Sequence, residues 1–356
     1  MKDVIVVGGG VIGLACAVRL RRGGARVRML ESSGEHQSYY GAAASAAAAG
    51  MLAPLKETAS AHDELAMASF DIWRRTQPGA EWADGVRFDG AVVVRPSADE
   101  AAAFAAHARG LGRKATLLSA AEFRKRTGFR AGVEHGVFVE DEGTADPLRV
   151  LSGLAMQAHA LGVLRDYGAD VAAVTPASAS THAGKVYEAD AVVLAPGVWA
   201  TEPLMAAAPA LRLVRPGKGH LTAVALDQRL GPNLRMPGFY IAQRRNDAVL
   251  GATMELDRYD RRVNPDRVAE LHACAEKVLP DEVKLGESAW AGVRPMSPDG
   301  WPLIGPSGDG VLVAAGHSRD GWLLAPITAE IISAYVFGDE IPADWAAVSP
   351  ARFGNS

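Results

Sequence analysis

Three glycines near the N-terminus have the spacing that brings a protein backbone close to a phosphate group. Gly8, Gly10 and Gly13 form the pattern G-x-G-x-x-G, between the apolar residues 4–7 and a helical pattern that begins at Val11. The first glycine permits a tight turn, the second lets the main chain approach a pyrophosphate, and the third allows helix and strand to pack closely. The positive N-terminal end of the helix would attract the same pyrophosphate.

An acidic residue follows this motif at the distance that a dinucleotide site requires. Glu31 lies 18 residues after Gly13, where a carboxylate can accept hydrogen bonds from both hydroxyls of a ribose. The sequence therefore predicts a dinucleotide site. The motif by itself does not distinguish FAD from NAD, and a glycine-rich turn without a ligand is the alternative interpretation.

A second candidate for chemistry is Arg294, in the stretch WAGVRPMSPDGWPLIG (290–305). Small and apolar residues surround it, and arginine is rarely buried without an anionic partner. A planar guanidinium suits the two-pronged binding of a carboxylate. The stretch thus indicates an anion site, and the alternative is a structural ion pair with an Asp or Glu at a domain interface.

Composition limits the class of protein. The chain has 356 residues, of which 49% are hydrophobic, so it can form one large domain or two ordinary ones around a sizeable core. A net charge of -4 argues against binding to nucleic acid. Cys16 and Cys274 suggest no disulfide framework and no metal site, and we expect both thiols to be buried. The small-residue run 41–52 is too short to span a bilayer, so we expect a cytoplasmic protein without an integral membrane segment.

The elements that must position these residues can be predicted from periodicity and caps. Strands are predicted at 4–7, 26–30, 163–167 and 191–194, and strand-like segments at 86–95, 211–226, 239–243, 248–253 and 287–294. Helices are predicted from Val11 to about Arg22, from Asp146-Pro147 to about Leu161, from Asn264-Pro265 to about Leu279 and over about 322–337, with a capping box at Ser119.

The α/β pieces thus lie at the start, middle and end of the chain, with strand-rich pieces between them. This predicts an α/β fold with a discontinuous Rossmann-like nucleotide-binding domain and an inserted α+β domain built on a mainly antiparallel sheet. We assign residues 1–84, 148–206 and 295–350 to the first domain. We assign residues 85–147 and 207–294 to the second, as the substrate-binding domain.

Four stretches resemble the D-amino acid oxidase superfamily of FAD enzymes, and within it the glycine oxidases. They are residues 45–54 (SAAAAGMLAP), 191–201 (AVVLAPGVWAT), 290–305 and 314–332 (AAGHSRDGWLLAPITAEII). The resemblance covers nearly the whole chain in the same order, and it is weakest at 100–145. It implies FAD rather than NAD. The FAD should be non-covalent, because residues 295–300 lack the cysteine through which the related sarcosine oxidases hold their flavin.

The resemblance also implies where the cofactor lies. The segment at Ser45 would run past the FAD phosphates towards the flavin, and the helix that opens near Gly321 would point at the flavin pyrimidine. The positive end of that helix would stabilise the anion formed on reduction. The expected cofactor-binding residues are Gly8, Gly10, Val11, Ile12, Gly13, Glu31, Ser45, Ala49, Gly50, Met51, Val171, Ala195, Gly197, Trp199, Arg294, His317, Arg319, Asp320, Gly321 and Trp322.

For the substrate, the resemblance implies that Arg294 and the Tyr240 hydroxyl hold the carboxylate of an amino acid, with Arg319 near substrate and flavin. These three are the candidate catalytic residues, and Met51 and His220 are candidates for the substrate pocket. Besides the ion pair already given for Arg294, the other four have plainer alternatives: Tyr240 as an edge-strand tyrosine, Arg319 as a solvated loop arginine, Met51 as a core methionine and His220 as a hydrogen-bonded histidine.

The implied activity is oxidative deamination of glycine or another small amino acid, such as sarcosine or a small D-amino acid. Hydride would pass to flavin N5, and the imino acid would give an oxo acid and ammonia. Molecular oxygen would then yield hydrogen peroxide. A role in thiamine thiazole biosynthesis follows from the resemblance alone. The alternatives are a D-amino acid dehydrogenase with a quinone or protein acceptor, and a flavin-binding subunit that needs a partner chain. The preferred amino acid and a possible homo-oligomer stay open.

Overall fold

The first of the two large sheets contains the predicted βαβ unit. The computed structural model describes residues 1–34, 43–56, 59–131, 133–226, 231–245 and 247–354. The sheet consists, in spatial order, of β20 (Leu303–Ser307), β21 (Val311–Ala315), β13 (Ala191–Leu194), β1 (Asp3–Val7), β2 (Arg26–Glu31) and β9 (Leu164–Tyr167). Its pairings are parallel except for β20 with β21. Four of these strands are predicted correctly, whereas β20 and β21 are not predicted.

This sheet is covered on both faces, which explains why β1 is apolar from Val4 to Val7. Val4 and Val6 pack among the helices on one face, whereas Ile5 and Val7 face a smaller sheet on the other. The helices are α1 (Val11–Arg22), α4 (Asp63–Thr76), α7 (Pro147–Ala160) and α10 (Gly321–Phe337). The opposite face is covered by β10 (Val171–Thr175), β11 (Ser178–Thr181), β12 (Val186–Glu188) and α8 (Glu202–Ala207).

The second large sheet is mainly antiparallel, as predicted. Its strands are, in spatial order, β18 (Glu255–Leu256), β14 (Arg215–Leu226), β17 (Ala248–Gly251), β16 (Phe239–Gln243), β15 (Asn233–Met236), β5 (Ala91–Val94), β7 (Gly136–Val139) and β6 (Ala115–Leu118), and β19 (Val283–Met296) pairs with β14. The pairing of β5 with β15 is parallel. The helices α5 (Ala98–Gly110), α6 (Ala120–Thr127) and α9 (Pro265–Val278) pack against this sheet. A small sheet, β3 (Met51–Leu52), β8 (Gly143–Ala145) and β4 (Val86–Arg87), lies beside it.

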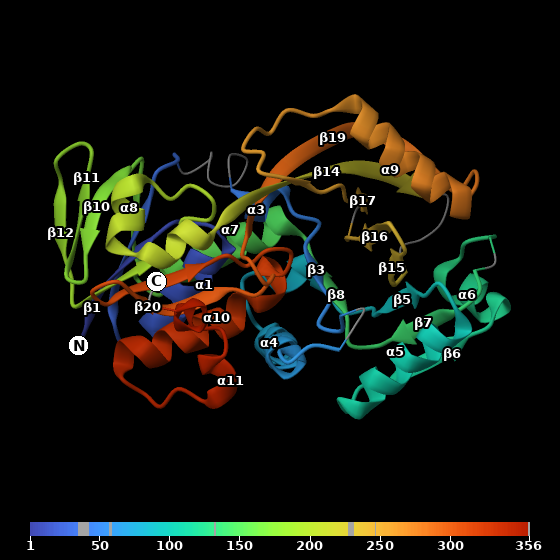
Figure 1. The fold of residues 1–356 in the computed structure, drawn as a ribbon, viewed down its shortest axis with the longest axis horizontal. Helices are drawn as coiled ribbons and strands as arrows, with labels where there is room; N and C mark the ends of the chain where they lie inside the picture. Colours follow the sequence, from blue (N-terminus) through green and yellow to red (C-terminus); the bar gives the residue numbers. More distant parts are fainter. Residues whose placement is uncertain (35–42, 57–58, 132, 227–230, 246, 355–356) are drawn as a thin grey trace.

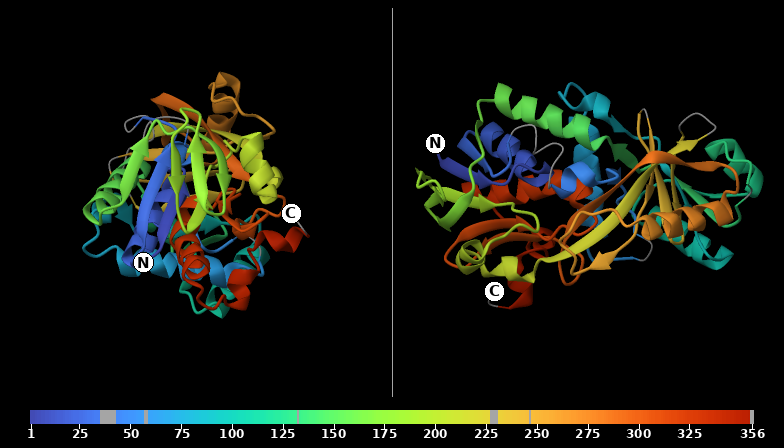
Figure 2. Two further views of the ribbon diagram at one scale, coloured as in Figure 1. Left: turned by 90° about the vertical axis from the view of Figure 1, so that its left-hand side faces the viewer. Right: turned by 90° about the horizontal axis from the view of Figure 1, so that it is seen from above.

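The long strands β14 and β19 connect the two halves of the molecule. They form an antiparallel ladder from Arg215 opposite Met296 to Leu226 opposite Val283. Figure 1 and the right-hand view of Figure 2 show both strands, in yellow and orange, running from the Rossmann-like half into the second sheet. The predicted domain boundaries remain a proposal, which the separation of the chain into these two sheets supports.

Some local predictions are wrong, and each error has a physical reason. Residues 86–95 are not one strand, because Gly90, with a φ of 77°, turns the chain between β4 and β5, which belong to different sheets. The strand predicted at 211–226 starts later, because Pro209–Leu213 form a 3-10 helix. Cys16 is buried as expected, but Cys274 is exposed, because α9 buries Val268, Leu271 and Ala275 on its other face.

The predicted helix boundaries are largely confirmed. Asp146 accepts a hydrogen bond from the Arg149 amide at the start of α7, and Asn264 caps α9 in the same way. The capping box at Ser119 and Glu122 is present in α6. Among the described helices, none combines the length and the apolar character needed to cross a bilayer.

Candidate active site

A cavity of about 960 Å³ lies between the two large sheets and takes residues from both. This volume is at the upper end of the usual range for ligand pockets, about 300–1,000 Å³. The cavity brings together nearly all of the predicted site residues. Those that line it are Gly8, Gly10, Val11, Ile12, Glu31, Ser45, Ala49, Gly50, Met51, Val171, Ala195, Gly197, Trp199, Tyr240, Arg294, His317, Arg319, Asp320, Gly321 and Trp322. Gly13 and His220 are not among the lining residues.

The glycine motif forms one end of the cavity. Gly8 has a φ of 107°, and a Cβ atom there would overlap the carbonyl oxygen of Ala195 at the end of β13. A Cβ atom on Gly13 would overlap the carbonyl oxygen of Gly8, so Gly13 acts in packing behind the cavity wall. Gly10 is the N-cap residue of α1, and a Cβ atom there would lie 3.2 Å from Ser45 Oγ. The first helix therefore presents its N-terminus to the cavity.

Glu31 ties the end of β2 to this motif. Its Oε2 accepts a hydrogen bond of 2.6 Å from the Gly9 amide, and its Oε1 accepts one of 2.8 Å from the Ser33 amide. The side chain lines the cavity, and a carboxylate has about four lone-pair sites, so it can accept further hydrogen bonds from a ligand. Glu31 therefore lies in the cavity wall beside the glycine motif, and its role as a ribose ligand stays a prediction.

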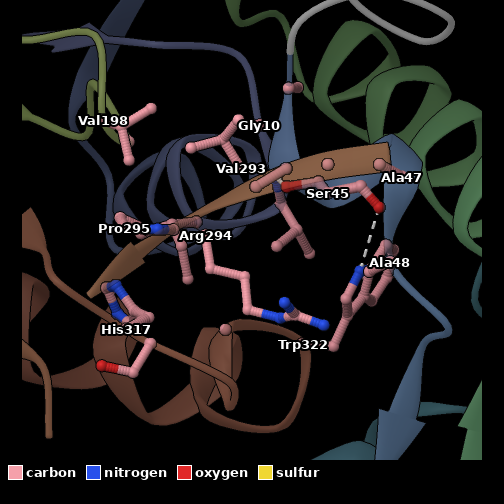
Figure 3. Close-up of a pocket in the computed structure, with 18 of the residues that line it drawn as sticks. Gly10, Ser45, Ala47, Ala48, Val198, Val293, Arg294, Pro295, His317 and Trp322 are labelled. Atoms are coloured by element: carbon pink, nitrogen blue, oxygen red, sulfur yellow. Dashed lines mark hydrogen bonds between the residues drawn. The ribbon is translucent and has the colours of Figure 1, made fainter. Parts of the chain in front are cut away.

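The segment around Ser45 is a short helix, which extended chain follows. Ser45 Oγ accepts a hydrogen bond of 3.0 Å from the Val11 amide, at the start of α1. Trp322 Nε1 donates to the carbonyl oxygen of Ser45 over 3.1 Å, as Figure 3 shows, and Trp290 Nε1 donates to that of Ala47 over 2.8 Å. Side chains from α10 and β19 therefore fix the main chain of α3 (Ala44–Ala47) against the cavity. The sequence gives no local signal for Trp290, which is 243 residues away from its partner.

Arg294 extends from β19 into the cavity (Figure 3). Its guanidinium lies against Gly219 of β14, where a Cβ atom would overlap it. Nη1 donates to the carbonyl oxygen of Thr253 over 3.4 Å, and the guanidinium also interacts with Tyr240. Burial lowers the pKa of Arg294, an effect that Tyr240 opposes and Arg319 reinforces.

The alternative interpretation of Arg294, a structural ion pair, has no support from its surroundings. No carboxylate of the described residues forms an ion pair with Arg294, although this side chain is largely withdrawn from solvent. A buried cation without a carboxylate is costly and favours an anionic ligand. The geometry thus fits a site for an external anion in the cavity.

Tyr240 lies beside Arg294 on β16. It is opposite Gly251, where a Cβ atom would overlap the tyrosine hydroxyl, so the small neighbour leaves room for the ring. Burial raises the pKa of Tyr240, while the positive charges of Arg294, Arg244 and Arg319 act in the opposite direction. The hydroxyl therefore keeps its proton to a higher pH than an ordinary tyrosine does, and it can donate a hydrogen bond to an anion.

The turn before α10 brings charged and neutral groups to the same wall. Arg319 is exposed at the cavity, and Asp320 forms an ion pair with Lys56, which sequence analysis did not single out. His317 is buried and its Nε2 lies 3.0 Å from Thr328 Oγ1. Burial lowers the pKa of His317 to about 3, so this ring is neutral. Gly321 begins α10, so the positive end of the helix adjoins the cavity.

His220 is not part of the cavity wall. Its neighbours Gly219 and Leu221 line the cavity, and because side chains alternate along a strand, His220 points to the other face of β14. There it is fully buried, accepts a 3.1 Å hydrogen bond from the Asn264 amide at Nε2, and contacts Thr253 Oγ1 at 2.9 Å through Nδ1. The structure thus places His220 behind the site, and the plainer alternative for this residue fits its contacts.

Comparison with known proteins gives matches over the full length. The chain matches the family described as FAD dependent oxidoreductase (DAO) over residues 3–335. It is 30% identical to a glycine oxidase of Bacillus licheniformis, over 96% of this chain and 95% of that protein. It is 31% identical to a bifunctional protein ThiO/ThiG of Synechocystis, over 99% of this chain, but spans only 54% of that protein's length. The crystal structure of glycine oxidase from Geobacillus kaustophilus superimposes with a TM-score of 0.84 at 28% identity and covers 99% of each chain.

Proposed function

The chain belongs to the FAD dependent oxidoreductase family, and we propose that it oxidises glycine or another small amino acid by oxidative deamination. One observation carries the choice of substrate class. Arg294 is a partly buried cation in the cavity with no carboxylate partner among the described residues, and the hydroxyl of Tyr240, whose pKa burial raises, lies beside it. Together they suit the carboxylate of an amino acid.

The residues of the cavity fit FAD. The N-terminus of α1, with Gly8 and Gly10, would hold the pyrophosphate, and Glu31 would hold the ribose. The N-terminus of α10 would supply positive potential near the flavin ring. Bound there, FAD would supply the two-electron chemistry: it would accept a hydride from the α-carbon of the amino acid and be reoxidised by oxygen, which would become hydrogen peroxide. The substrate would be left as an imino acid, which water would hydrolyse to an oxo acid and ammonia.

The protein's own contribution is to bind and orient the substrate. Arg294 and Tyr240 would fix the carboxylate and so the direction of the α-carbon. The apolar cluster of Met51, Tyr240 and Trp290 packs against β14 and β17 and limits water at this wall. Both buried histidines of the region, His220 and His317, are engaged in hydrogen bonds, so we assign neither of them as a base. The amine must therefore be neutral before oxidation.

The proposed reaction predicts a characteristic pH dependence. In anaerobic stopped-flow experiments, the rate of flavin reduction by a small amino acid should rise with pH and level off once the bound amine is neutral. Because burial raises the pKa of Tyr240, this residue keeps its proton in that range. Tyr240→Phe should then bind substrate more weakly but show the same pH profile. A profile that disappears in Tyr240→Phe would assign the titration to the tyrosine instead.

The same experiment separates the proposed function from its alternatives. The panel is glycine, sarcosine, D-alanine and L-alanine, with air admitted after reduction. Flavin that is bleached and then restored with peroxide release supports the oxidase. Flavin that stays reduced in air favours a dehydrogenase. A protein named D-amino acid dehydrogenase from Sinorhizobium medicae is 30% identical to this chain, over 62% of this chain's length. Flavin reduced by none of the four contradicts the proposed function and favours a subunit that needs a partner.

A biosynthetic role is a finer part of the proposal. Relatives named bifunctional ThiO/ThiG carry a region similar to this chain within a longer protein. We propose that the imino acid formed from glycine can supply thiamine thiazole synthesis. Restored growth of a thiamine-requiring strain that lacks its own glycine oxidase would support this role, and lack of growth with active enzyme present would oppose it.

Replacement of Glu31 by alanine is expected to weaken FAD binding by about 10- to 150-fold, since hydrogen bonds to a charged group contribute about 1.5–3 kcal/mol. The loss has two sources, because Glu31 would bind the ribose and also holds the amides of Gly9 and Ser33. Titration of apoprotein with FAD, followed by flavin fluorescence, measures the effect. Glu100→Ala, at an exposed helix start, is the control. Equal FAD affinity in Glu31→Ala and wild type would exclude Glu31 as the ribose ligand.

A further inference from the structure

We propose that Arg244 is a positioning residue that fixes the main chain of residues 48–50 so that two of its amides serve the FAD cavity. Arg244 lies in the turn between β16 and β17, outside the cavity lining. Its Nη2 donates a hydrogen bond of 2.7 Å to the carbonyl oxygen of Ala48, and its Nε donates one of 3.3 Å to that of Ala49. This inference takes from the proposed function only that FAD occupies the cavity.

The environment of Arg244 is unusual for a cation. Its side chain is 11% exposed. Its ion pair with Asp247 is long, with 3.8 Å between Nη1 and Oδ2, and the Asp247 side chain is half exposed. Burial lowers the pKa of Arg244. A buried guanidinium needs hydrogen-bond acceptors, and here two consecutive main-chain carbonyls provide them. The contacts therefore fix the chain at Ala48 and Ala49 more firmly than a solvated arginine could.

Because the peptide bond is planar, the hydrogen bonds from Arg244 to two carbonyls also set the direction of the neighbouring amides. In a trans peptide the carbonyl of one residue and the amide of the next point in opposite directions. Carbonyls of Ala48 and Ala49 that face Arg244 thus turn the amides of Ala49 and Gly50 to the side opposite Arg244. Both residues line the cavity, and within the described part of the chain neither amide has a hydrogen-bond partner. They are donors for a ligand.

Among the described residues, contacts other than those of Arg244 hold the two ends of this stretch but not its middle. The tryptophans Trp322 and Trp290 bind the carbonyls of Ser45 and Ala47. Beyond the stretch, Gly50 has a φ of 81°, and its carbonyl accepts a 2.8 Å hydrogen bond from the Ala145 amide. Within the described ranges, Arg244 is the side chain that binds the carbonyls of the peptides between these anchors. It follows β16, the strand of Tyr240, so it also links the substrate sheet to the cofactor wall.

The test compares Arg244→Met, Arg244→Lys and Arg244→Ala as apoproteins titrated with FAD. We expect FAD to bind about tenfold or more weakly to Arg244→Met, a change that corresponds to roughly 1.4 kcal/mol. Arg244→Lys should bind FAD more tightly than Arg244→Met but more weakly than wild type, because an ammonium cannot reproduce the fixed fork of donors. Millimolar guanidinium chloride should restore FAD affinity and the flavin absorption spectrum in Arg244→Ala, an effect that a purely structural defect would not show. Arg245→Ala, the neighbouring and exposed arginine, is the control and should bind FAD like wild type.

The outcomes distinguish this inference from the proposed function. Wild-type FAD affinity and spectrum in folded Arg244→Met would overturn the positioning role. So would a folded Arg244→Ala whose lost affinity does not respond to guanidinium. If Arg244→Met does not fold, Arg244→Lys decides, because equal affinity to wild type would again overturn the role. A wild-type protein that binds FAD but oxidises no amino acid would contradict the proposed function and leave the FAD measurements on Arg244 unaffected.

Discussion

Replacement of Arg294 by alanine is expected to lower kcat/KM for the amino-acid substrate by roughly 30- to 4000-fold, with folding and FAD retention preserved. The side chain is partly buried and its guanidinium lies in the cavity without a carboxylate partner among the described residues, so a bound substrate carboxylate would be its charge partner. Loss of one member of a desolvated charge pair costs about 2–5 kcal/mol. Steady-state peroxide formation and anaerobic flavin reduction would both measure this effect.

Two further variants make the Arg294 experiment specific. Arg294→Lys should recover little activity, because a point charge does not form two parallel hydrogen bonds to a carboxylate. Arg267→Ala is a matched control, since Arg267 is a half-exposed arginine on α9 that pairs with Glu270. Turnover within a few-fold of wild type in Arg294→Ala would place the carboxylate site elsewhere and make Arg294 a structural residue.

Replacement of Gly13 by alanine should give a protein that purifies without FAD and unfolds at a lower temperature. The added methyl group would overlap the carbonyl oxygen of Gly8, which is main chain and cannot move aside as a flexible side chain can. Overpacking of this kind costs about 1–3 kcal/mol, and here it displaces α1 from the turn that would hold the pyrophosphate. Flavin content after purification and thermal unfolding of the apoprotein measure the two effects.

Two other glycines serve as comparisons for Gly13→Ala. In Gly10→Ala the new Cβ atom would meet only Ser45 Oγ at 3.2 Å, so the apoprotein should remain stable while FAD binding falls. In Gly110→Ala nothing lies within 4 Å of the new atom, so both properties should remain as in wild type. Retention of FAD by Gly13→Ala would show that α1 can shift without loss of the cofactor site.

The sequence alone determined the parts of this protein whose physics is local. The first βαβ unit and the caps at Asp146, Asn264 and Ser119 depend on residues a few positions apart, and the structure has them where they were predicted. Glu31 could be placed near the glycine motif for the same reason, since a strand, a turn and a helix fix its distance. Arg294 could be singled out as a candidate for binding an anion because a cation among apolar residues needs a partner wherever it lies, and this role stays a prediction.

The tertiary structure decided the contacts that depend on register and on distant pieces of chain. The sequence predicts His220 as a candidate for the substrate pocket, but which face of β14 meets the cavity depends on the packing of the second sheet. The alternation along the strand turns His220 away from the cavity. The hydrogen bonds from Arg244 to the carbonyls of Ala48 and Ala49 join residues almost 200 positions apart. No pattern within a few residues encodes such a contact, because it exists only once the two sheets have packed against each other.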